Sequence, residues 1–313
     1  MGDASALTFE SIEVPPPGPG EVQVRHTAIG VNFVDVYHRS GLYPLPLPFI
    51  PGQEGAGVVT VVGEGVTSLV VGQRVAYAGL PGAYAEVRNA KVDRLVLLPD
   101  EISDLTAASI MLKGMTAESL LKRCHPVSAE ETLLFHAAAG GVGTLATQWA
   151  RHLGATVIGA VGSPGKVALA ASTCHHVICL ADGPWVDKVK ALSGGLGVHV
   201  VYDSVGKDTV PQSLDALRAR GLLVSFGQSS GKPAPLDIFS LGGMRSLFVT
   251  RPTLHAYNHT RAELEQSAAA LFAVIRAGHV KVKPPRVFPL ADAQQAHRAL
   301  EGRETTGSVV LVP

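Results

Sequence analysis

Charged residues, cysteine and aromatic residues are all scarce in this sequence. Charged side chains make up 17% of its 313 residues, and 26 lysines and arginines balance 26 aspartates and glutamates. A formal net charge of zero disfavours general attraction to nucleic acid or to an acidic membrane. Cys124, Cys174 and Cys179 are too few and too irregularly spaced for a disulfide framework or a four-cysteine zinc site.

Long apolar runs are absent too. No uninterrupted stretch reaches the roughly 18 residues of a membrane-spanning helix, and the N-terminus lacks a basic-then-apolar signal pattern. We therefore expect a cytoplasmic protein with room for two domains. The twelve histidines do not fall into metal-binding spacing, and no Gly-x-Ser-x-Gly elbow is present. The sequence thus predicts neither a metal site nor a nucleophilic triad.

The chain changes texture along its length. Residues 12–98 are rich in short strands, expected at 21–26, 55–63 and 72–77, which favour a small barrel or irregular sheet. Strands expected at 132–136, 155–161, 198–203, 222–227 and 247–250 alternate with helical stretches, a pattern typical of a parallel sheet. Helices are expected at 264–277 and 291–300. A final strand at 307–312 is expected to rejoin the N-terminal domain, so we predict domains at 1–113 and 114–250, with 251–313 returning to the first.

A glycine-rich turn lies between the expected strand at 132–136 and a helical stretch at 144–153. It reads Gly140, Gly141, Val142, Gly143. Glycines let a backbone approach a pyrophosphate closely, and a helix N-terminus offers it free N–H groups and a favourable dipole. The turn therefore favours a dinucleotide site, although close packing of a helix on a sheet without a ligand explains the same glycines.

The segment after the next strand indicates which dinucleotide binds. Sites that prefer NAD place an acidic residue about 20 residues past the glycines, on the ribose hydroxyl. This chain has no carboxylate there but Gly162, Ser163, Pro164, Gly165 and Lys166. A hydroxyl, amides and a lysine suit a 2′-phosphate, so the cofactor is expected to be NADP(H). The alternative for Lys166 is a solvated lysine at a helix start.

Several motifs carry a family resemblance: IGVNFVDVY at 29–37, RSGLYP at 39–44, LKGMT at 112–116, FHAAAGGVG at 135–143, VYDSVG at 201–206 and VTRP at 249–252. With them the chain resembles, over nearly its whole length, the zinc-free quinone oxidoreductases of the medium-chain dehydrogenase/reductase superfamily, which include zeta-crystallin-like NADPH:quinone reductases. The resemblance implies an α/β fold. A GroES-like β-rich catalytic domain would join a Rossmann-type, doubly wound cofactor domain, with the active site in the cleft between them. It also implies a homodimer through the edge strand near Leu247–Thr250, since an open apolar edge is a pairing hazard.

The resemblance also implies roles for residues. Gly141 and Val142 would hold the pyrophosphate, and Gly162, Ser163 and Lys166 the adenosine phosphate. The adenine and ribose would be lined by Val205, Gly227, Gln228, Ser229 and Ser230. The nicotinamide end would be bordered by Phe33, Val34, Asp35, Thr253, Leu254 and His255. Arg303 would reach the cofactor, and Asn32, Tyr37 and Tyr43 would lie at the mouth of a quinone pocket.

Some positions depart from the family pattern. Gln53 stands where zinc-containing relatives have histidine, which argues against a catalytic metal. Leu180 replaces a tyrosine of the phosphate site, so one hydrogen-bond donor to the 2′-phosphate is absent. A hydrogen bond to a charged group is worth about 1.5–3 kcal/mol, and the preference for NADPH is therefore expected to be weaker. Ser119 replaces a second tyrosine near the cofactor, which would widen the cleft. The resemblance also implies a strand before the segment at 2–7 that this sequence does not contain, which would either expose a sheet edge or reflect a shortened start.

The activity implied is reduction of a quinone by NADPH. Asn32 would bind a quinone oxygen or the nicotinamide ribose, and Tyr37 would donate a proton or pack against a flat ring; a structural aromatic explains Tyr37 equally well. Two alternatives stay open. The same hydride geometry serves the double bond of an enone or alkenal, and some relatives have become NADPH-binding structural or RNA-binding proteins. Neutral charge disfavours the RNA-binding alternative.

Overall fold

Two sheets organise the chain, each within its own compact unit. The computed structural model describes residues 1–302 and 304–313. Unit 1 consists of Met1–Met115, Asn258–Arg276 and Val282–Pro313, and unit 2 of Thr116–Tyr257 and Ala277–Lys281. The boundary falls within helix α2 (Asp104–Glu118).

Unit 1 is built on a sheet that mixes antiparallel and parallel pairs. Its other elements are β1 (Glu21–Val31), α1 (Phe33–Ser40), β2 (Glu54–Val62), β3 (Arg74–Ala78), β4 (Val87–Lys91), β5 (Val96–Leu97), α8 (Arg261–Arg276), β12 (Arg286–Pro289), α9 (Ala293–Glu301) and β13 (Val309–Val312). Within the described residues the strand order is β12-β13-β1-β2-β3-β5, with β4 also paired to β1. The C-terminal strand β13 therefore lies beside β1, with Ile29 opposite Leu311.

The strands of unit 1 have the alternating polar and apolar residues that are typical of a sheet with one buried face. In β1 the side chains of Val22, Val24 and His26 are buried, while Arg25, between Val24 and His26, is exposed. This two-residue period puts one face of the sheet on the core. The core also takes in Val59, Val75 and other buried residues of β2, β3 and β13.

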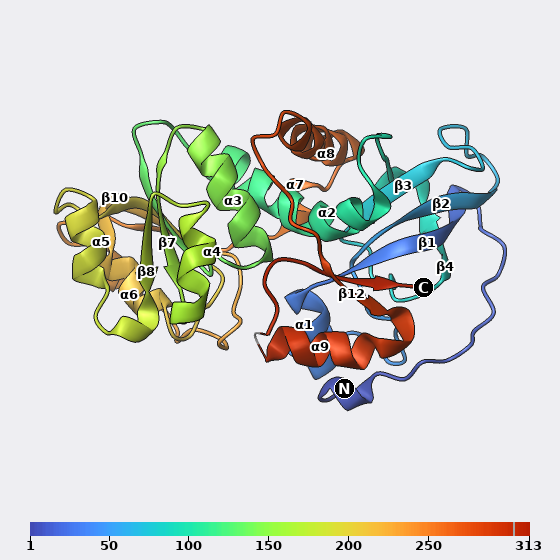
Figure 1. Cartoon of the computed structure of the whole chain (residues 1–313), viewed down its shortest axis with the longest axis horizontal. Helices are drawn as coiled ribbons and strands as arrows, with labels where there is room; N and C mark the ends of the chain where they lie inside the picture. The colour runs from blue at the N-terminus through green and yellow to red at the C-terminus, as the bar shows by residue number, and fades with distance from the viewer. Residues whose placement is uncertain (303) are drawn as a thin grey trace. The chain divides into compact units, whose positions relative to one another are not determined.

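Unit 2 is built on a parallel sheet (Figure 1). Its elements are β6 (Thr132–His136), α3 (Gly141–His152), β7 (Thr156–Val161), α4 (Val167–Ala171), β8 (His176–Cys179), α5 (Val186–Leu192), β9 (Val198–Asp203), α6 (Val210–Asp215), β10 (Leu217–Ser225), β11 (Phe248–Thr250) and α7 (Leu254–Tyr257). In the described part of the chain the strand order is β11-β10-β9-β6-β7-β8, and every pair is parallel.

The strand order of unit 2 reverses between β6 and β9. From β6 the chain moves outward through β7 and β8, then returns to the other side for β9, β10 and β11. Sheets of this kind bind ligands at the carboxyl ends of the strands beside such a switch point. The near-continuous apolar runs of β6 and β9, buried on both faces, are typical of a parallel sheet covered by helices.

The structure confirms the expected strands with some shifts of their ends. Strands 132–136 and 198–203 match β6 and β9, whereas the strand expected at 222–227 begins earlier, at Leu217. The helix expected at 291–300 begins at Ala293 because the chain first makes a short 3-10 turn, Leu290–Asp292. None of the described helices is both long and apolar enough to cross a membrane.

Candidate functional site

The loops at the carboxyl edge of the parallel sheet bring together the predicted cofactor residues of unit 2. They follow five neighbouring strands, at 137–143 after β6, 162–166 after β7, 204–206 after β9, 226–230 after β10 and 251–255 after β11. Parallel strands end at the same edge, so residues up to 118 positions apart in sequence share one end of the sheet. Thr253, Leu254 and His255 open or precede α7 at this edge.

The glycine turn leads directly into a helix. Gly140 is the N-cap of α3, and Thr144 N–H donates to the Gly140 carbonyl at 2.9 Å. The N–H groups of Gly141, Val142 and Gly143 precede that first bond and have no acceptor within the helix. They lie at the positive end of the helix dipole, an arrangement suited to an anion.

Gly143 is required by close packing. A Cβ on Gly143 would lie 2.3 Å from the backbone oxygen of Ala137, which is far inside contact distance. Ala137 itself has a φ of 51°, a left-handed conformation that turns the chain sharply out of β6. The two features together hold the start of α3 against the end of the strand.

The loop after β7 has free space around its backbone, whereas the glycine turn after β6 is tightly packed. A Cβ on Gly162 or Gly165 would meet nothing within 4 Å. Gly165 and Lys166 belong to a 3-10 turn, Pro164–Lys166, in which Lys166 N–H donates to the Ser163 carbonyl at 3.1 Å. The loop thus combines free space, a hydroxyl and a half-buried lysine.

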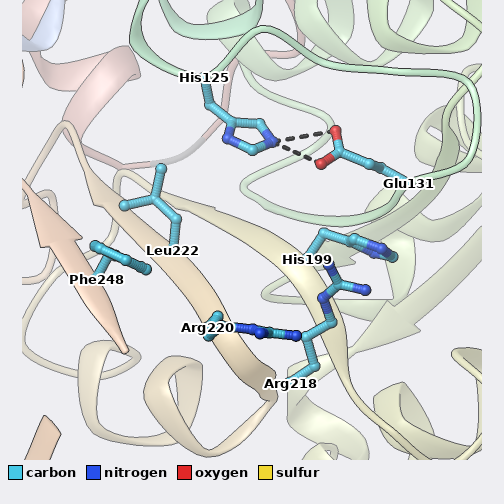
Figure 2. Close-up of a pocket in the computed structure, with 7 residues that line it drawn as sticks. All are labelled: His125, Glu131, His199, Arg218, Arg220, Leu222 and Phe248. Carbon is cyan, nitrogen blue, oxygen red and sulfur yellow. Dashed lines mark hydrogen bonds and ion pairs between the residues drawn. The ribbon is translucent and has the colours of Figure 1, made fainter. Parts of the chain in front are cut away.

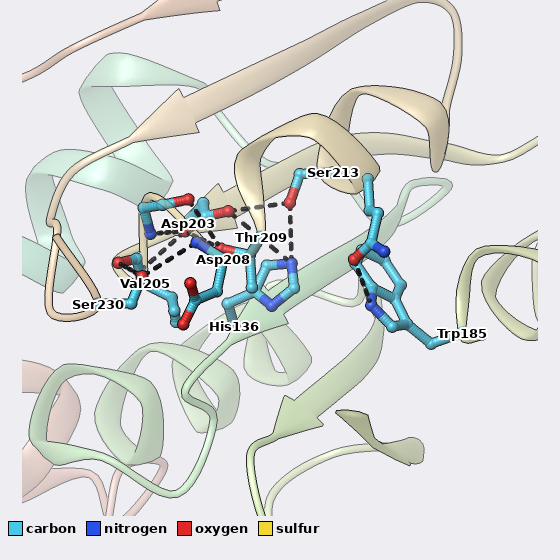
Figure 3. Close-up of polar contacts among 10 residues, drawn as sticks. His136, Trp185, Asp203, Val205, Asp208, Thr209, Ser213 and Ser230 are labelled. Carbon is cyan, nitrogen blue, oxygen red and sulfur yellow. Dashed lines mark hydrogen bonds and ion pairs between the residues drawn. The ribbon is translucent and has the colours of Figure 1, made fainter. Parts of the chain in front are cut away.

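Asp203, the last residue of β9, organises the next loop (Figure 3). Its buried carboxylate accepts hydrogen bonds through Oδ1 from Val205 N–H at 2.8 Å, Gly206 N–H at 3.0 Å and Thr209 Oγ1 at 2.9 Å. Oδ2 accepts from Ser213 Oγ at 2.9 Å. With four donors, the negative charge is satisfied without a cation, so Asp203 fixes the loop that contains Val205.

His136, at the end of β6, completes this buried cluster. Its Nε2–H donates to Ser213 Oγ at 3.0 Å, because that hydroxyl already donates to Asp203. Burial lowers the pKa of His136, although the Asp203 charge acts in the opposite direction. Nδ1 of the ring is buried without a partner among the described residues.

Backbone hydrogen bonds join the loops after β9 and β10. Ser229 N–H donates to the Ser204 carbonyl at 3.1 Å, and Ser230 N–H to the Val205 carbonyl at 2.8 Å. A Cβ on Gly227 would lie 2.8 Å from the Ser204 carbonyl oxygen, so glycine permits this approach. The structure consequently brings together the predicted residues Val205, Gly227, Gln228, Ser229 and Ser230.

The remaining predicted cofactor positions differ in their surroundings. The Leu180 side chain packs against the apolar core of unit 2. Ser119 is buried in a π-helix, Ser119–Cys124, and its hydroxyl donates to the Thr116 carbonyl at 2.9 Å. Arg303 lies outside the described residues.

In unit 1, Asn32 is held by a buried carboxylate that the sequence analysis did not single out. Asn32 Nδ2 donates to Glu54 Oε2 at 2.8 Å, and the same oxygen accepts from Lys113 Nζ at 3.2 Å. Glu54 Oε1 accepts from Leu112 N–H at 2.8 Å. Glu54 is fully buried and directly follows Gln53 in the sequence. A Cβ on Gly30 would lie 2.2 Å from Glu54 Oε2, so glycine makes room for the carboxylate.

Asp35 points inward from the first turn of α1. Its Oδ2 accepts from Asn32 N–H at 2.8 Å and from Tyr84 Oη at 3.1 Å, and its Oδ1 is buried without a partner in the described structure. Burial raises the pKa of Asp35 to about 7. Tyr84 Oη also contacts His297 Nε2 at 2.9 Å. The side chain of Asp35 is thus part of the core, while Phe33 and Val34 beside it are only half-buried.

Two of the predicted substrate residues, Tyr37 and Tyr43, form an aromatic group with Phe33 on and after α1. The rings of Tyr37 and Tyr43 meet edge to face with centroids 5.2 Å apart, and Phe33 lies 6.2 Å from Tyr37. His38 Nδ1 contacts the Tyr43 carbonyl at 3.0 Å, and its Nε2 contacts the Gln53 amide at 3.2 Å. Gln53 is therefore a hydrogen-bonding partner of His38. Across residues 1–302 and 304–313, no three His, Cys, Asp or Glu side chains are grouped to hold a metal ion.

Comparison with known proteins settles the family. Residues 18–100 match the alcohol dehydrogenase GroES-like domain, and residues 141–272 match the zinc-binding dehydrogenase domain. The quinone oxidoreductase of Pseudomonas aeruginosa is 47% identical over 100% of this chain and 97% of that protein. The chain belongs to the quinone oxidoreductase family. The expected membership of the medium-chain dehydrogenase/reductase superfamily and the expected GroES-like and Rossmann-type fold are thereby confirmed.

Two further relatives also match this chain over its whole length. The crystal structure of Escherichia coli quinone oxidoreductase complexed with NADPH has a TM-score of 0.97 and 45% identity, and covers 100% of this chain and 97% of that one. A 2-haloacrylate reductase of a Burkholderia species is 44% identical over 100% of this chain and 96% of that protein. The relatives of this chain thus include a quinone oxidoreductase that binds NADPH and a reductase of 2-haloacrylate.

Proposed function

We propose that this protein reduces quinones with NADPH and uses no metal ion. The observation that carries the proposal is the convergence of five loops at the carboxyl edge of the parallel sheet, next to the switch point between β6 and β9. The loops supply the N-terminus of α3 with its unbonded N–H groups, the side chain of Lys166, and an open stretch at 162–166 that contains no carboxylate. Family membership supports the same reading.

The residues present fit a phosphorylated dinucleotide. Backbone N–H groups of Gly141 and Val142 would bind the pyrophosphate, and Ser163 and Lys166 the 2′-phosphate, where a carboxylate would repel it. NADPH supplies a hydride to the acceptor when it is bound. The Asp203 cluster contributes by fixing the loop of Val205 before any ligand arrives, which lowers the entropy lost on binding.

The substrate side is proposed to lie at Asn32, Tyr37 and Tyr43. Glu54 takes one N–H of the Asn32 amide and so fixes the direction of the rest of the group, which would bind a quinone oxygen. Tyr37 and Tyr43 offer adjoining aromatic surface for a planar ring. Quinones are good acceptors, so orientation and exclusion of water would suffice.

A second candidate is reduction of an activated carbon–carbon double bond. It is favoured by the 44% identity to the 2-haloacrylate reductase, because hydride delivery to a β-carbon followed by protonation needs the same cofactor. Turnover of a naphthoquinone and of a 2-haloacrylate or alkenal under NADPH separates the two. A rate with the alkene that exceeds the quinone rate would overturn the quinone assignment.

The coenzyme side is tested by Lys166→Ala. Loss of a hydrogen bond to a charged phosphate corresponds to about a ten- to hundredfold loss in kcat/KM for NADPH, with that for NADH unchanged. Lys188→Ala, on α5, removes the same charge elsewhere in unit 2 and is the control. Unchanged discrimination between the two coenzymes in Lys166→Ala would contradict the role of this lysine.

We also propose that two copies pair through β11. Within the described residues this strand has β10 as its one sheet neighbour, and Phe248 and Val249 are 59% and 39% exposed. An open apolar edge of this kind favours pairing with a second edge. Val249→Lys is expected to shift sedimentation from dimer to monomer, and a monomeric wild type would refute the proposal.

A further inference from the structure

A cavity of about 330 Å³ lies in unit 2 at the end of the sheet opposite the coenzyme loops (Figure 2). Apart from His125, which follows the π-helix Ser119–Cys124, its lining residues lie at or near the amino ends of the strands. Glu131 directly precedes β6, His199 is the second residue of β9, and Phe248 opens β11. The proposed quinone reduction uses none of these side chains.

A bulge in β10 shapes this cavity. Leu217 pairs with Val198 and Leu222 with Val200, so residues 218–221 of β10 stand opposite His199 alone. Arg220 in the bulge has a φ of 60°, a left-handed conformation that costs a non-glycine residue of order 1 kcal/mol or more. Its N–H is tied to the Arg245 carbonyl. The bulge thus presents two arginines, Arg218 and Arg220, to the cavity at the expense of backbone strain.

The cavity is rich in donors and poor in acceptors. Arg218 Nε is buried and has no hydrogen-bond partner among the described residues. Of the described lining residues only Glu131 is acidic, and its carboxylate is already bound by His125 Nε2 at 3.0 and 3.1 Å and by Ser128 N–H at 3.0 Å. The described lining therefore has two guanidinium groups against a single carboxylate, an excess of positive charge.

His199 adds a further donor. Its Nδ1 accepts a hydrogen bond from Thr132 N–H at 3.1 Å, so the hydrogen of the neutral ring is on Nε2. Burial and then the neighbouring Arg218 lower the pKa of His199, while Glu131 acts in the opposite direction. In Figure 2, the guanidinium of Arg218 extends toward His199.

The opposite wall is apolar. Leu222 and Phe248 are direct partners in the β10–β11 ladder, and Phe248 is 59% exposed. The cavity volume of about 330 Å³ falls at the lower end of the range for small-molecule sites, about 300–1,000 Å³, and exceeds what an inorganic anion fills. We propose that this cavity binds a small organic anion, with its carboxylate or phosphate head on Arg218 and Arg220 and its apolar body against Leu222 and Phe248.

Calorimetric titration of the full-length protein tests the proposal. Phenyl phosphate and benzoate are the two probes. Inorganic phosphate, which has only the anionic head, and phenol, which has only the aromatic ring, are the controls. At least one aromatic anion is expected to bind with one site per chain, about tenfold or more tighter than inorganic phosphate, and phenol is expected not to bind. Comparing the two aromatic anions identifies the preferred head group. Excess NADPH is expected to leave the titration unchanged, because the coenzyme loops lie at the other end of the sheet.

Variants locate the site. Arg218→Gln is expected to weaken binding about tenfold or more. Arg220→Asn removes the second charge and keeps a residue type that tolerates the left-handed backbone, so it serves if the first variant does not fold. Arg151→Gln, which removes a charge from α3, is the matched control and is expected to bind normally. No binding by the wild type, normal binding by Arg218→Gln or Arg220→Asn, or displacement by NADPH would overturn the proposal.

Discussion

The buried carboxyl group of Asp35 predicts a specific dependence of stability on pH. Its pKa is about 7 in the folded protein, against an ordinary value of 3.8, because the group is buried. Between these values the folded state holds a proton that the unfolded state has released. The contribution of this group to the free energy of unfolding is therefore fully present below pH 3.8 and is lost as pH rises toward 7. Above pH 7 it no longer changes.

The magnitude follows from the difference between the two pKa values. At about 1.4 kcal/mol for each pKa unit, a difference of about three units corresponds to a ceiling of about 4 kcal/mol. His26 and His297 act in the opposite sense, because burial lowers the pKa of each to about 4 and their stabilisation is lost as pH falls from 6.5 to 4. The wild-type profile alone combines these effects, so the diagnostic quantity is the difference between variants.

Asp35→Asn removes the titrating group and nearly preserves its shape. Relative to the wild type, the variant is expected to gain free energy of unfolding from pH 5 to pH 7, by about 1.4 kcal/mol per pH unit, and nothing further from pH 7.5 to 8.5. Urea unfolding across this range, followed by fluorescence, measures the difference. Asp93→Asn, at an exposed position of unit 1, is expected to track the wild type. A difference between Asp35→Asn and the wild type that is constant from pH 5 to 8 would refute the reasoning.

Three further substitutions have clear expected outcomes. Gly143→Ala would force a Cβ to 2.3 Å from the Ala137 oxygen, so we expect a loss of about 1–3 kcal/mol and weaker NADPH binding, with Gly165→Ala unchanged in thermal unfolding. Lys113→Met leaves Glu54 buried without its cation; denaturant unfolding should show a loss of about 3–5 kcal/mol, partly restored by adding Glu54→Gln. Asp203→Ala orphans several donors, and we expect about 3 kcal/mol or more of destabilisation together with a raised KM for NADPH. Wild-type values for any of these would contradict the packing or charge argument behind it.

Local pattern was sufficient to predict the parallel sheet. Its strands are continuous apolar runs bounded by glycine, serine or aspartate, and β6 and β9 were predicted with their observed ends. Strand β10 was predicted too short, because the polar bulge at 218–221 interrupts the apolar pattern although pairing with β9 continues on both sides. Helix α3 begins at Gly141 rather than Thr144, since tertiary packing at Gly143 overrides the low helix propensity of glycine.

The site residues divide in the same way. The glycine turn and the loop at 162–166 were readable because their chemistry is local in sequence. The Glu54–Lys113 pair joins residues 59 positions apart, and the Asp203 cluster depends on which strands are neighbours, so neither follows from spacing. Phe33 and Asp35 show a further limit: both occur in one family motif, yet one side chain is half-buried beside aromatic rings and the other lies in the core.

The insertion of β13 between β1 and β12 has a consequence for synthesis on the ribosome. Unit 2 is complete, except for Ala277–Lys281, once Tyr257 has emerged, whereas β1, although it can already pair with β2 and β4, lacks its neighbour β13 until Val309–Val312 have been made. Because domains fold as units during translation, the later unit is expected to acquire its structure first. Until then the Ile29–Val31 end of β1 has no partner on the side that β13 later covers, and this exposed apolar edge is what a chaperone would have to protect.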